Sequence, residues 1–212
     1  MFVFDYFKDH LLRLAQKDLP INTTKRILKD ALRGLAELHD QDVVHTDMKA
    51  DNILIDWEDH ESEISVRRAG NWMWRSPEAH ASGPLNKPSD IFSFALVCIC
   101  AVHKRVIFAV GDEELEEGVD PLAIVLERQI SYFPDADGID AFLRHLGSDN
   151  PWVRIFEVVR DGFGTDNPRR PFSLWKGVDE DFKDLVCAMT NFDPEKRITA
   201  REALSHKWFE GI

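Results

Sequence analysis

The stretch HTDMKADN, at residues 45–52, gathers four ionisable side chains and an amide into eight positions, and an apolar ILI follows it directly. Groups of these types at such close spacing can position and neutralise a phosphoryl group, provided that partners come from elsewhere in the chain. The alternative is structural, because Asp and Asn also favour turns in which they cap nearby backbone groups. The residues that decide between the two are Asp47, Lys49 and Asn52.

The charge balance of the chain disfavours a nucleic-acid partner. Its 212 residues carry a formal net charge of −12, whereas nucleic-acid binders present clustered Lys and Arg. The acidic runs at residues 111–118 and 135–140 are expected to form solvated surface. The second run does not fit an EF-hand calcium loop, because Gly138 is fourth in it and that loop needs glycine at the sixth position.

Length and composition predict one intracellular domain with a proper core. The chain is 44% hydrophobic and 30% charged, which is typical of a globular protein of this size. Its three cysteines are too few for a disulfide framework or a zinc site, and no leader is expected at its start. The longest apolar run, residues 91–102, is too short for a membrane span of about 20 residues. We expect it to be a buried helix, and we expect no membrane partner.

The hydrophobic pattern predicts a mostly helical chain with a few short strands. Strands are expected at the opening MFVFDYF, at residues 43–45 and at residues 52–56, and a charged hairpin at residues 57–63 would lead to a strand at 64–66. Residues 9–17 are expected to form a short helix. A longer helix, capped by Asn22 or Thr23, should bury a face that includes Leu28, Leu32 and Leu35. Further helices are expected over residues 89–103, 121–133, 138–146, 150–160, 179–190 and 199–207.

The stretch at residues 45–52 resembles the catalytic loop of protein kinases, in which an Asp is followed by a Lys two positions on and an Asn five positions on. Three further stretches resemble kinase landmarks in the same order: RSPEA, PSDIFSFALVC and DPEKRITAREALSHKWF. They correspond to the close of the activation segment, the buried helix that begins with Asp, and the final Arg-bearing turn and helix. On these motifs the chain is identified as a member of the eukaryotic protein kinase family, of Ser/Thr type, similar to fungal kinase-like proteins.

This resemblance implies a protein-kinase-like α+β fold over residues 1–212, comprising the hinge and a mostly α-helical C-terminal lobe, with the N-terminal lobe absent. It also implies ATP and Mg²⁺ as cofactors and a protein hydroxyl as the phosphate acceptor. Asp47 would accept or orient the proton of that hydroxyl, Lys49 would steady the phosphate, and Asn52 would hold magnesium. Leu54 would lie beneath the adenine.

The same resemblance implies adenine contacts from backbone groups in the opening segment, at Asp5 and Phe7, with Phe4 beside the pocket. Without a covering lobe, Phe2, Phe4, Phe7 and Leu54 would present an apolar patch that favours self-association or a protein partner.

Four other residues are assigned to structure on the family pattern. His45 would hold the catalytic loop, and Asp90 would tie down its backbone. Glu78 and Arg197 would form a buried ion pair.

Two departures from the family pattern bear on activity. Position 46 is Thr, as in SR-protein kinases, where most kinases have Arg. An Asp-Phe-Gly triplet is expected near Ser65 and Val66, yet that stretch reads ISVRRAGN, and the DGFG at residues 161–164 lies too far along the chain. The 13 positions from Ser65 to Glu78 also compare with roughly two dozen in the family.

Phosphate transfer by this chain alone is therefore expected to be very weak. Loss of one preorganised electrostatic group typically costs about 10² to 10³ in rate, and the Gly-rich loop, the strand Lys and the metal-binding Asp are not found in the sequence. The alternative function is a non-catalytic pseudokinase that binds a protein partner.

Overall fold

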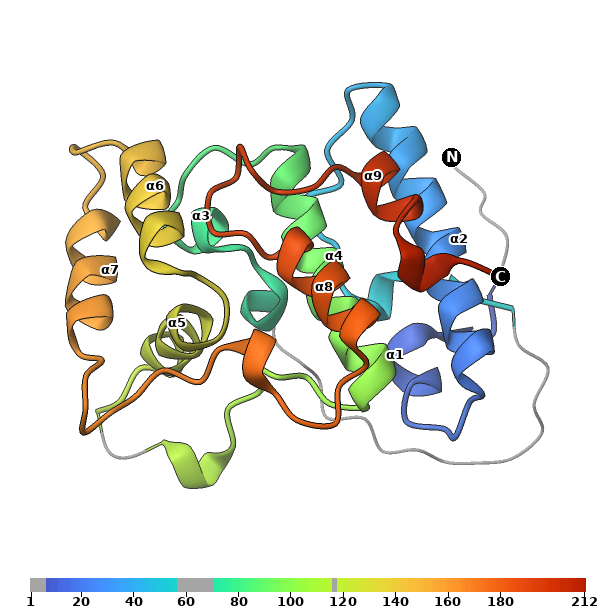
Figure 1. The fold of residues 1–212 in the computed structure, drawn as a ribbon, viewed down its shortest axis with the longest axis horizontal. Helices are drawn as coiled ribbons and strands as arrows, with labels where there is room; N and C mark the ends of the chain where they lie inside the picture. Colours follow the sequence, from blue (N-terminus) through green and yellow to red (C-terminus); the bar gives the residue numbers. More distant parts are fainter. Residues whose placement is uncertain (1–6, 57–70, 116–117) are drawn as a thin grey trace.

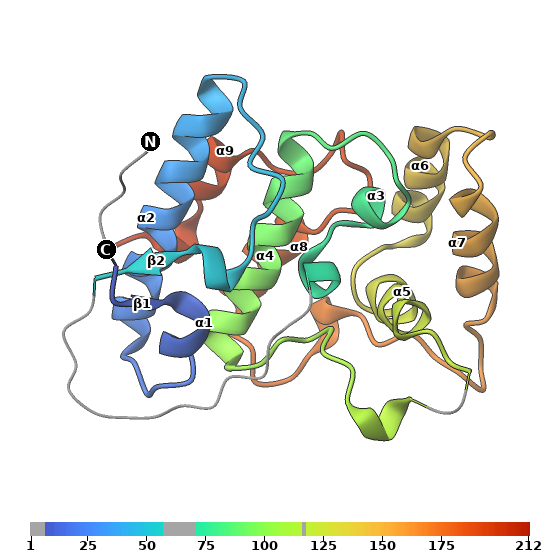
Figure 2. The ribbon, with the colours of Figure 1, turned by 180° about the vertical axis from the view of Figure 1, so that it is seen from behind.

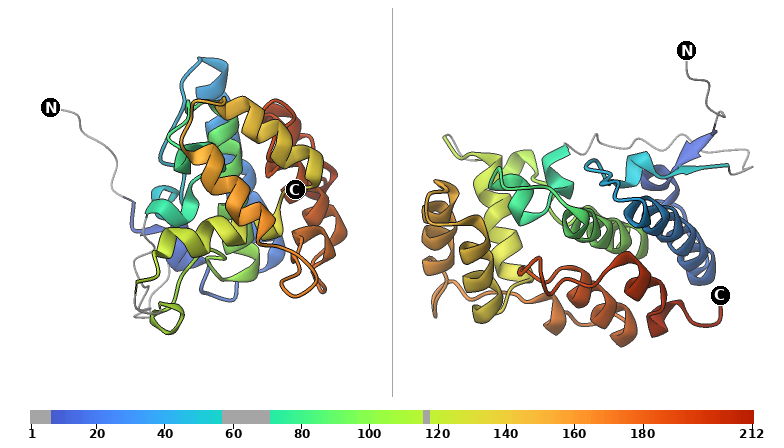
Figure 3. Two further views of the ribbon diagram at one scale, coloured as in Figure 1. Left: turned by 90° about the vertical axis from the view of Figure 1, so that its left-hand side faces the viewer. Right: turned by 90° about the horizontal axis from the view of Figure 1, so that it is seen from above.

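The computed structural model describes residues 7–56, 71–115 and 118–212, and within them the chain is mostly helical (Figure 1). The helices α2, α4, α8 and α9 form one part of the molecule and α5, α6 and α7 the other, with the short α3 between them. Seen from above, α2 and α4 lie side by side over α8 and α9 (Figure 3). The α-helices are α1 (Leu11–Leu14), α2 (Ile21–Asp40), α3 (Pro77–His80), α4 (Lys87–His103), α5 (Pro121–Tyr132), α6 (Ala136–Leu146), α7 (Trp152–Asp161), α8 (Glu180–Met189) and α9 (Ala200–Leu204).

Helix α4 is the centre of the core, as its unbroken apolar sequence predicts. Every residue from Ser89 to Ala101 is buried, because a helix that is apolar all round needs packing partners on all sides. It begins two residues earlier than expected, since Asn86 caps it through a capping box with Ser89 and Pro88 fits the first turn. It ends at His103, and the next residue, Lys104, has a left-handed φ of 57°.

Helix α2 buries the predicted face but not from the predicted start. Leu28, Leu32 and Leu35 are buried on one side, which confirms the periodic pattern. The expected cap at Asn22 or Thr23 is wrong, because α2 already begins at Ile21 with Pro20 in the capping position and no side-chain cap. Proline has a fixed φ that suits a helix entry, so the helix can start ahead of the polar residues.

The described strands are short and form one antiparallel pair against α1 (Figure 2). Strand β1 (Asp9–His10) pairs with β2 (Leu54–Ile55), with Asp9 opposite Ile55 and His10 opposite Leu54. The strand expected within residues 52–56 is confirmed, whereas the helix expected over residues 9–17 is reduced to the four residues of α1.

The strand expected at residues 43–45 is wrong. The backbone N–H of Val43 donates to the carbonyl of Leu38, and that of His45 donates to the carboxylate of Asp90. These donors are therefore already used by a turn and by a side chain, and residues 43–45 do not pair as a strand. The opening strand up to residue 6, the hairpin at residues 57–63 and the strand at residues 64–66 lie outside the described residues.

The later helices agree with the pattern to within a few residues at each end, except at the last one. Helix α9 stops at Leu204, and His206 then caps a separate 3₁₀ turn, Lys207–Phe209, by accepting from the N–H of Trp208. Helix α3 was not expected, because its four residues are too few to show a period; the hydroxyl of Ser76 caps it and Pro77 occupies its first turn.

The acidic runs are more than solvated surface. Asp135 accepts a bond of 2.7 Å from the N–H of Gly138 and so caps α6, and Glu114 pairs with Arg128. All three cysteines are free thiols. Among the described helices, none has the length and apolar character needed to cross a membrane.

Candidate functional site

The loop at residues 45–52 is fixed to the start of α4 by one buried carboxylate. Asp90, only 2% exposed, accepts from the N–H of His45 through Oδ2 at 2.7 Å and from the N–H of Thr46 through Oδ1 at 2.8 Å. Nε2 of His39, from the end of α2, lies 3.0 Å from the same Oδ2. The expectation that Asp90 ties down the loop backbone is confirmed.

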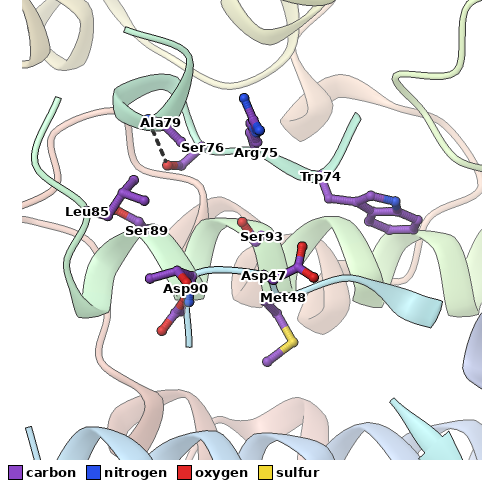
Figure 4. Close-up of a pocket in the computed structure, with 11 residues that line it drawn as sticks. Asp47, Met48, Trp74, Arg75, Ser76, Ala79, Leu85, Ser89, Asp90 and Ser93 are labelled. Atoms are coloured by element: carbon purple, nitrogen blue, oxygen red, sulfur yellow. Dashed lines mark hydrogen bonds between the residues drawn. The ribbon is translucent and has the colours of Figure 1, made fainter. Parts of the chain in front are cut away.

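The hydrogen bonds to Asp90 hold Thr46 in a backbone conformation that is unfavourable for this residue. Its φ is +62°, in the left-handed region that is costly for β-branched residues. His45 has a structural part in the same turn, because its Nδ1 accepts from the N–H of Asp47 at 3.3 Å. The turn aims the Asp47 side chain away from the anchor and toward an open cavity (Figure 4).

The three candidate residues of the loop lie together. Nδ2 of Asn52 donates to the backbone carbonyl of Asp47 at 2.8 Å and to its carboxylate Oδ2 at 2.7 Å. Nζ of Lys49 lies 3.3 Å from that Oδ2, with the Lys49 side chain 21% exposed and the Asp47 side chain 43% exposed. A carboxylate, an ammonium group and an amide therefore share one partly open corner of the molecule.

Asn52 offers one oxygen to a metal ion, and the described residues do not complete a site around it. Both of its bonds use Nδ2, so the amide oxygen Oδ1 is the atom that magnesium, which binds oxygen ligands, would take. Within residues 7–56, 71–115 and 118–212, no group of three or more His, Cys, Asp and Glu side chains is arranged to hold a metal ion. The donor set thus fits magnesium only in part.

The candidate adenine-contacting residues are less enclosed. Leu54 in β2 is 56% exposed and Phe7, just before β1, is 41% exposed. Asp5 and Phe4 lie outside the described residues. Leu54 therefore lies in β2, two residues after Asn52. Phe7 lies in the segment that leads into β1.

A cavity of about 230 Å³ adjoins Asp47 (Figure 4). Its walls come from three segments that are distant in sequence: the loop, the stretch that leads into α3, and the first turns of α4. Sequence reasoning missed the lining residues outside the loop, although most of them stand within or beside the RSPEA and PSDIFSFALVC motifs. They are Trp74, Arg75, Ser76, Ala79, Leu85, Ser89 and Ser93.

Behind this cavity, Glu78 of α3 and Arg197 form the expected buried ion pair. Nη1 of Arg197 lies 2.7 Å from Oε1 of Glu78 and Nη2 lies 3.3 Å from Oε2, with both side chains 0% exposed. The hydroxyl of Ser89 donates to the same Oε1 at 2.9 Å. Burial by itself raises the pKa of Glu78, but the charge and hydrogen bonds of Arg197 outweigh it, so the pKa lies below its ordinary value.

Comparison with known proteins gives consistent matches over almost all of the chain. Residues 1–209 match the family described as protein kinase domain. Cyclin-dependent kinase 4 of Ovis aries is 24% identical over 95% of this chain and 64% of its own length, and that of Xenopus laevis is 26% identical over 95% and 61%. The solved structure of a MAP kinase from Leishmania major superimposes with a TM-score of 0.72 at 19% identity, over 98% of this chain and 64% of that one. This chain thus spans less than two thirds of the length of each of these relatives.

Proposed function

The chain belongs to the protein kinase family, and from this premise we propose that its loop at residues 45–52 serves the transfer of the ATP γ-phosphate to a Ser or Thr hydroxyl of a protein. The observation that carries the proposal is the contact of Asp47, Lys49 and Asn52 on a loop that Asp90 anchors. Phosphoryl transfer demands little covalent chemistry of the protein, so positioned charge is its main contribution.

Each residue of the loop has a role in this proposal. Asp47 accepts the proton of the substrate hydroxyl, because its carboxylate is partly exposed and faces the cavity. Lys49, 3.3 Å from that carboxylate, neutralises the phosphate as it moves. Asn52 orients Asp47 through Nδ2 and leaves Oδ1 for magnesium, which when bound would neutralise the phosphate oxygens of ATP.

The nucleotide would meet the chain on its β1–β2 side. In this proposal Leu54 lies beneath the adenine, and the backbone groups of Asp5 and Phe7 bind its edge. We infer further that residues 1–212 correspond to the hinge and C-terminal lobe of a Ser/Thr kinase. A location inside the cell agrees with three free thiols in one chain.

The 212-residue chain by itself is proposed to be a very weak enzyme. No Asp or Glu occurs between residues 64 and 77, where the family places the second metal-binding residue. One such missing electrostatic group costs about 10² to 10³ in rate. The same observation supports a second candidate function, in which the chain is a pseudokinase that binds a protein partner without transferring phosphate.

Labelled phosphate transfer to a generic Ser/Thr substrate separates the two functions. We expect a small transfer signal from the wild-type chain with Mg-ATP and its loss in Asp47→Asn, which keeps the side-chain shape but cannot accept the proton. Asp51→Asn, a change in the same loop outside the triad, serves as the matched control and should keep the signal. If wild type and Asp47→Asn give the same transfer, the phosphotransfer proposal fails for this chain and the binding-module function is favoured.

Nucleotide binding gives an independent readout. A ligand stabilises a protein by RT ln(1 + [L]/Kd), so a site with a Kd near 10 mM would add less than about 0.1 kcal/mol at 1 mM nucleotide. We expect no measurable rise in Tm with millimolar Mg-ATP. A rise of several degrees that Asn52→Ala removes would overturn the proposed weakness of this chain.

A further inference from the structure

Two basic segments of this acidic chain meet at one tryptophan side chain. They are residues 103–110, after α4, and residues 167–178, before α8 (Figure 1). Both contain Arg and Lys but no Asp or Glu, although the net charge of the chain is −12. We propose that the surface they form docks an acidic peptide segment of a partner protein, with one apolar side chain of that segment packed on an exposed leucine. We call it the Trp175 surface, and it consists of Arg105, Arg170, Leu174, Trp175 and Lys176.

The cations of the Trp175 surface have no carboxylate partner among the described residues. The guanidinium carbon of Arg105 lies 5.0 Å from the centre of the Trp175 ring, and a guanidinium that stacks on a ring keeps its edge available for a carboxylate. Arg170 and Lys176 are exposed, and no ion pair in the described part of the chain involves either side chain.

The carboxylates that contact the two segments are bonded to other groups. Asp18 pairs with Lys104, and Glu127 accepts from Nδ2 of Asn167 at 3.3 Å. Asp179, the first acidic residue after the second segment, caps α8 by accepting from a backbone N–H of that helix. The positive charge of the Trp175 surface is therefore not neutralised by ion pairs, and it favours an anionic partner.

The loop that carries Leu174 is held in place by bonds to its neighbours. Nε1 of Trp175 donates to the carbonyl of Arg170 at 3.1 Å, and the N–H of Arg170 donates to Oγ of Ser131 in α5 at 2.9 Å. Phe172 is fully buried, with its ring centre 4.9 Å from that of Trp175. Leu174 is nevertheless 75% exposed, the highest value among the large apolar residues that the structure describes as exposed. An exposed leucine on a preorganised loop suits the apolar anchor of a docked segment.

A peptide suits this surface better than an anionic membrane does. Membrane-binding basic clusters hold about 4–8 Lys and Arg side chains, and the Trp175 surface has fewer. A membrane also meets the whole chain, whose net charge of −12 repels an anionic surface. A short acidic segment meets only the local positive charge.

The test is fluorescence anisotropy of the labelled peptide EELEE, titrated with the 212-residue chain at low salt. We expect saturable binding with a Kd of about 0.1 mM, because so small a contact belongs to the weak, transient interfaces. The neutral peptide QQLQQ should bind about tenfold more weakly, since it lacks the charge-assisted bonds. The peptide EEAEE should bind about fivefold more weakly, since it lacks the leucine.

Variants assign the binding to the Trp175 surface. Arg105→Gln and Lys176→Gln together should weaken EELEE binding about tenfold. Leu174→Ser should weaken EELEE binding about fivefold and leave EEAEE binding unchanged. Arg144→Gln is the matched control and should change neither, because Arg144 of α6 is likewise exposed and in no ion pair among the described residues. All of these side chains are exposed, and circular dichroism would verify that each variant folds.

Several results would overturn the proposal. The first is anisotropy that does not saturate up to about 1 mM chain, well above the expected Kd. Others are equal binding of EELEE and QQLQQ, or a loss in Arg144→Gln as large as that in the Arg105→Gln and Lys176→Gln double variant. Without peptide binding, sedimentation with phosphatidylserine vesicles that the double variant loses would assign the surface to a membrane. Without peptide binding, dimerisation in light scattering that Leu174→Ser removes would assign it to a second copy of the chain.

Discussion

Asp90 and Leu54 lie on two sides of the loop at residues 45–52, and they differ in burial and in bonding. Asp90 is 2% exposed and its two oxygens receive two backbone N–H groups and one histidine nitrogen. Leu54 is 56% exposed and belongs to a sheet of two residue pairs. The α4 side of the loop is therefore an anchored region, and the β1–β2 side is an open region.

This difference shows which half of the candidate site is held in place by buried contacts. The anchored region holds Asp47 at the cavity of about 230 Å³ through the buried carboxylate of Asp90, which accepts from two backbone N–H groups of the loop. In the open region, where the proposal places adenine, Leu54 and Phe7 are 56% and 41% exposed. Changes in the anchored region should thus cost much stability, and changes in the open region little.

The largest expected effect follows from breaking the buried ion pair in the anchored region. Arg197→Met leaves the carboxylate of Glu78 buried without its cation, which typically costs about 3 to 5 kcal/mol. Urea denaturation would measure it. Arg201→Gln, which breaks the exposed pair with Asp40, is the matched control at about 0 to 1 kcal/mol. Similar losses in the two variants would contradict the distinction between buried and exposed pairs.

The second largest effect is a pH dependence of the free energy of unfolding, which comes from His80 of α3. Burial, with the nearby positive charge of Arg75, lowers the pKa of His80 from 6.5 to about 4. As pH falls, His80 takes up a proton in the unfolded chain before it does so in the folded chain. The free energy of unfolding is therefore unaffected by His80 above pH 6.5, and it decreases as pH falls toward 4, by up to about 3 kcal/mol. His80→Gln should flatten this part of the stability curve. An unchanged slope between pH 6.5 and 4 would argue against a buried neutral histidine.

Loosening the loop anchor should have an intermediate effect. Asp90→Asn replaces one of two accepting oxygens by a donor, so either the N–H of His45 or that of Thr46 loses its partner. Hydrogen bonds to charged groups contribute about 1.5 to 3 kcal/mol each. Hydrogen exchange should show faster exchange at Thr46 with little change at Leu32, which is buried in α2. Equal acceleration of exchange at both amides would indicate global unfolding. It would contradict the prediction that Asp90 stabilises the loop in particular.

The smallest effect is expected in the open region. Leu54→Ser removes a side chain that is mostly in water, so the free energy of unfolding should change by no more than about 0.5 kcal/mol. Together with Phe7→Ser it should lower the binding of a hydrophobic dye and any self-association in light scattering. A loss of stability above about 1 kcal/mol would show that the β1–β2 side is packed, and the comparison between the two regions would fail.

Sequence patterns predicted the parts of this fold that repeat or that follow a motif. The stripe of Leu28, Leu32 and Leu35 and the apolar run of α4 have the period and the length of buried helices. The spacing of Asp47, Lys49 and Asn52 singled out three residues that the structure brings into contact. The partners that the motifs named, such as Asp90 for the loop, were also predicted, because the resemblance fixes pairs that are far apart in sequence.

The remaining features depend on contacts that no local pattern contains. Residues 43–45 have strand-forming side chains, but the carboxylate of Asp90, 45 residues away, takes the N–H of His45. The bond of His39 to Asp90 and the lining of the cavity beside Asp47 likewise arise from packing between segments distant in sequence. Pro20 as a helix entry was missed because polar residues follow it and are the commoner caps.

The left-handed φ of Thr46 gives the loop a place in the order of folding. An isolated peptide of residues 43–56 would have no reason to keep this conformation, since the left-handed helical region costs an L-residue about 1 to 2 kcal/mol and the compensating bonds come from Asp90. The turn that presents Asp47 is therefore expected to become stable only once α4 has brought Asp90 beside the loop. We therefore expect the Thr46 amide to become protected from exchange late in refolding, together with the packing of α4.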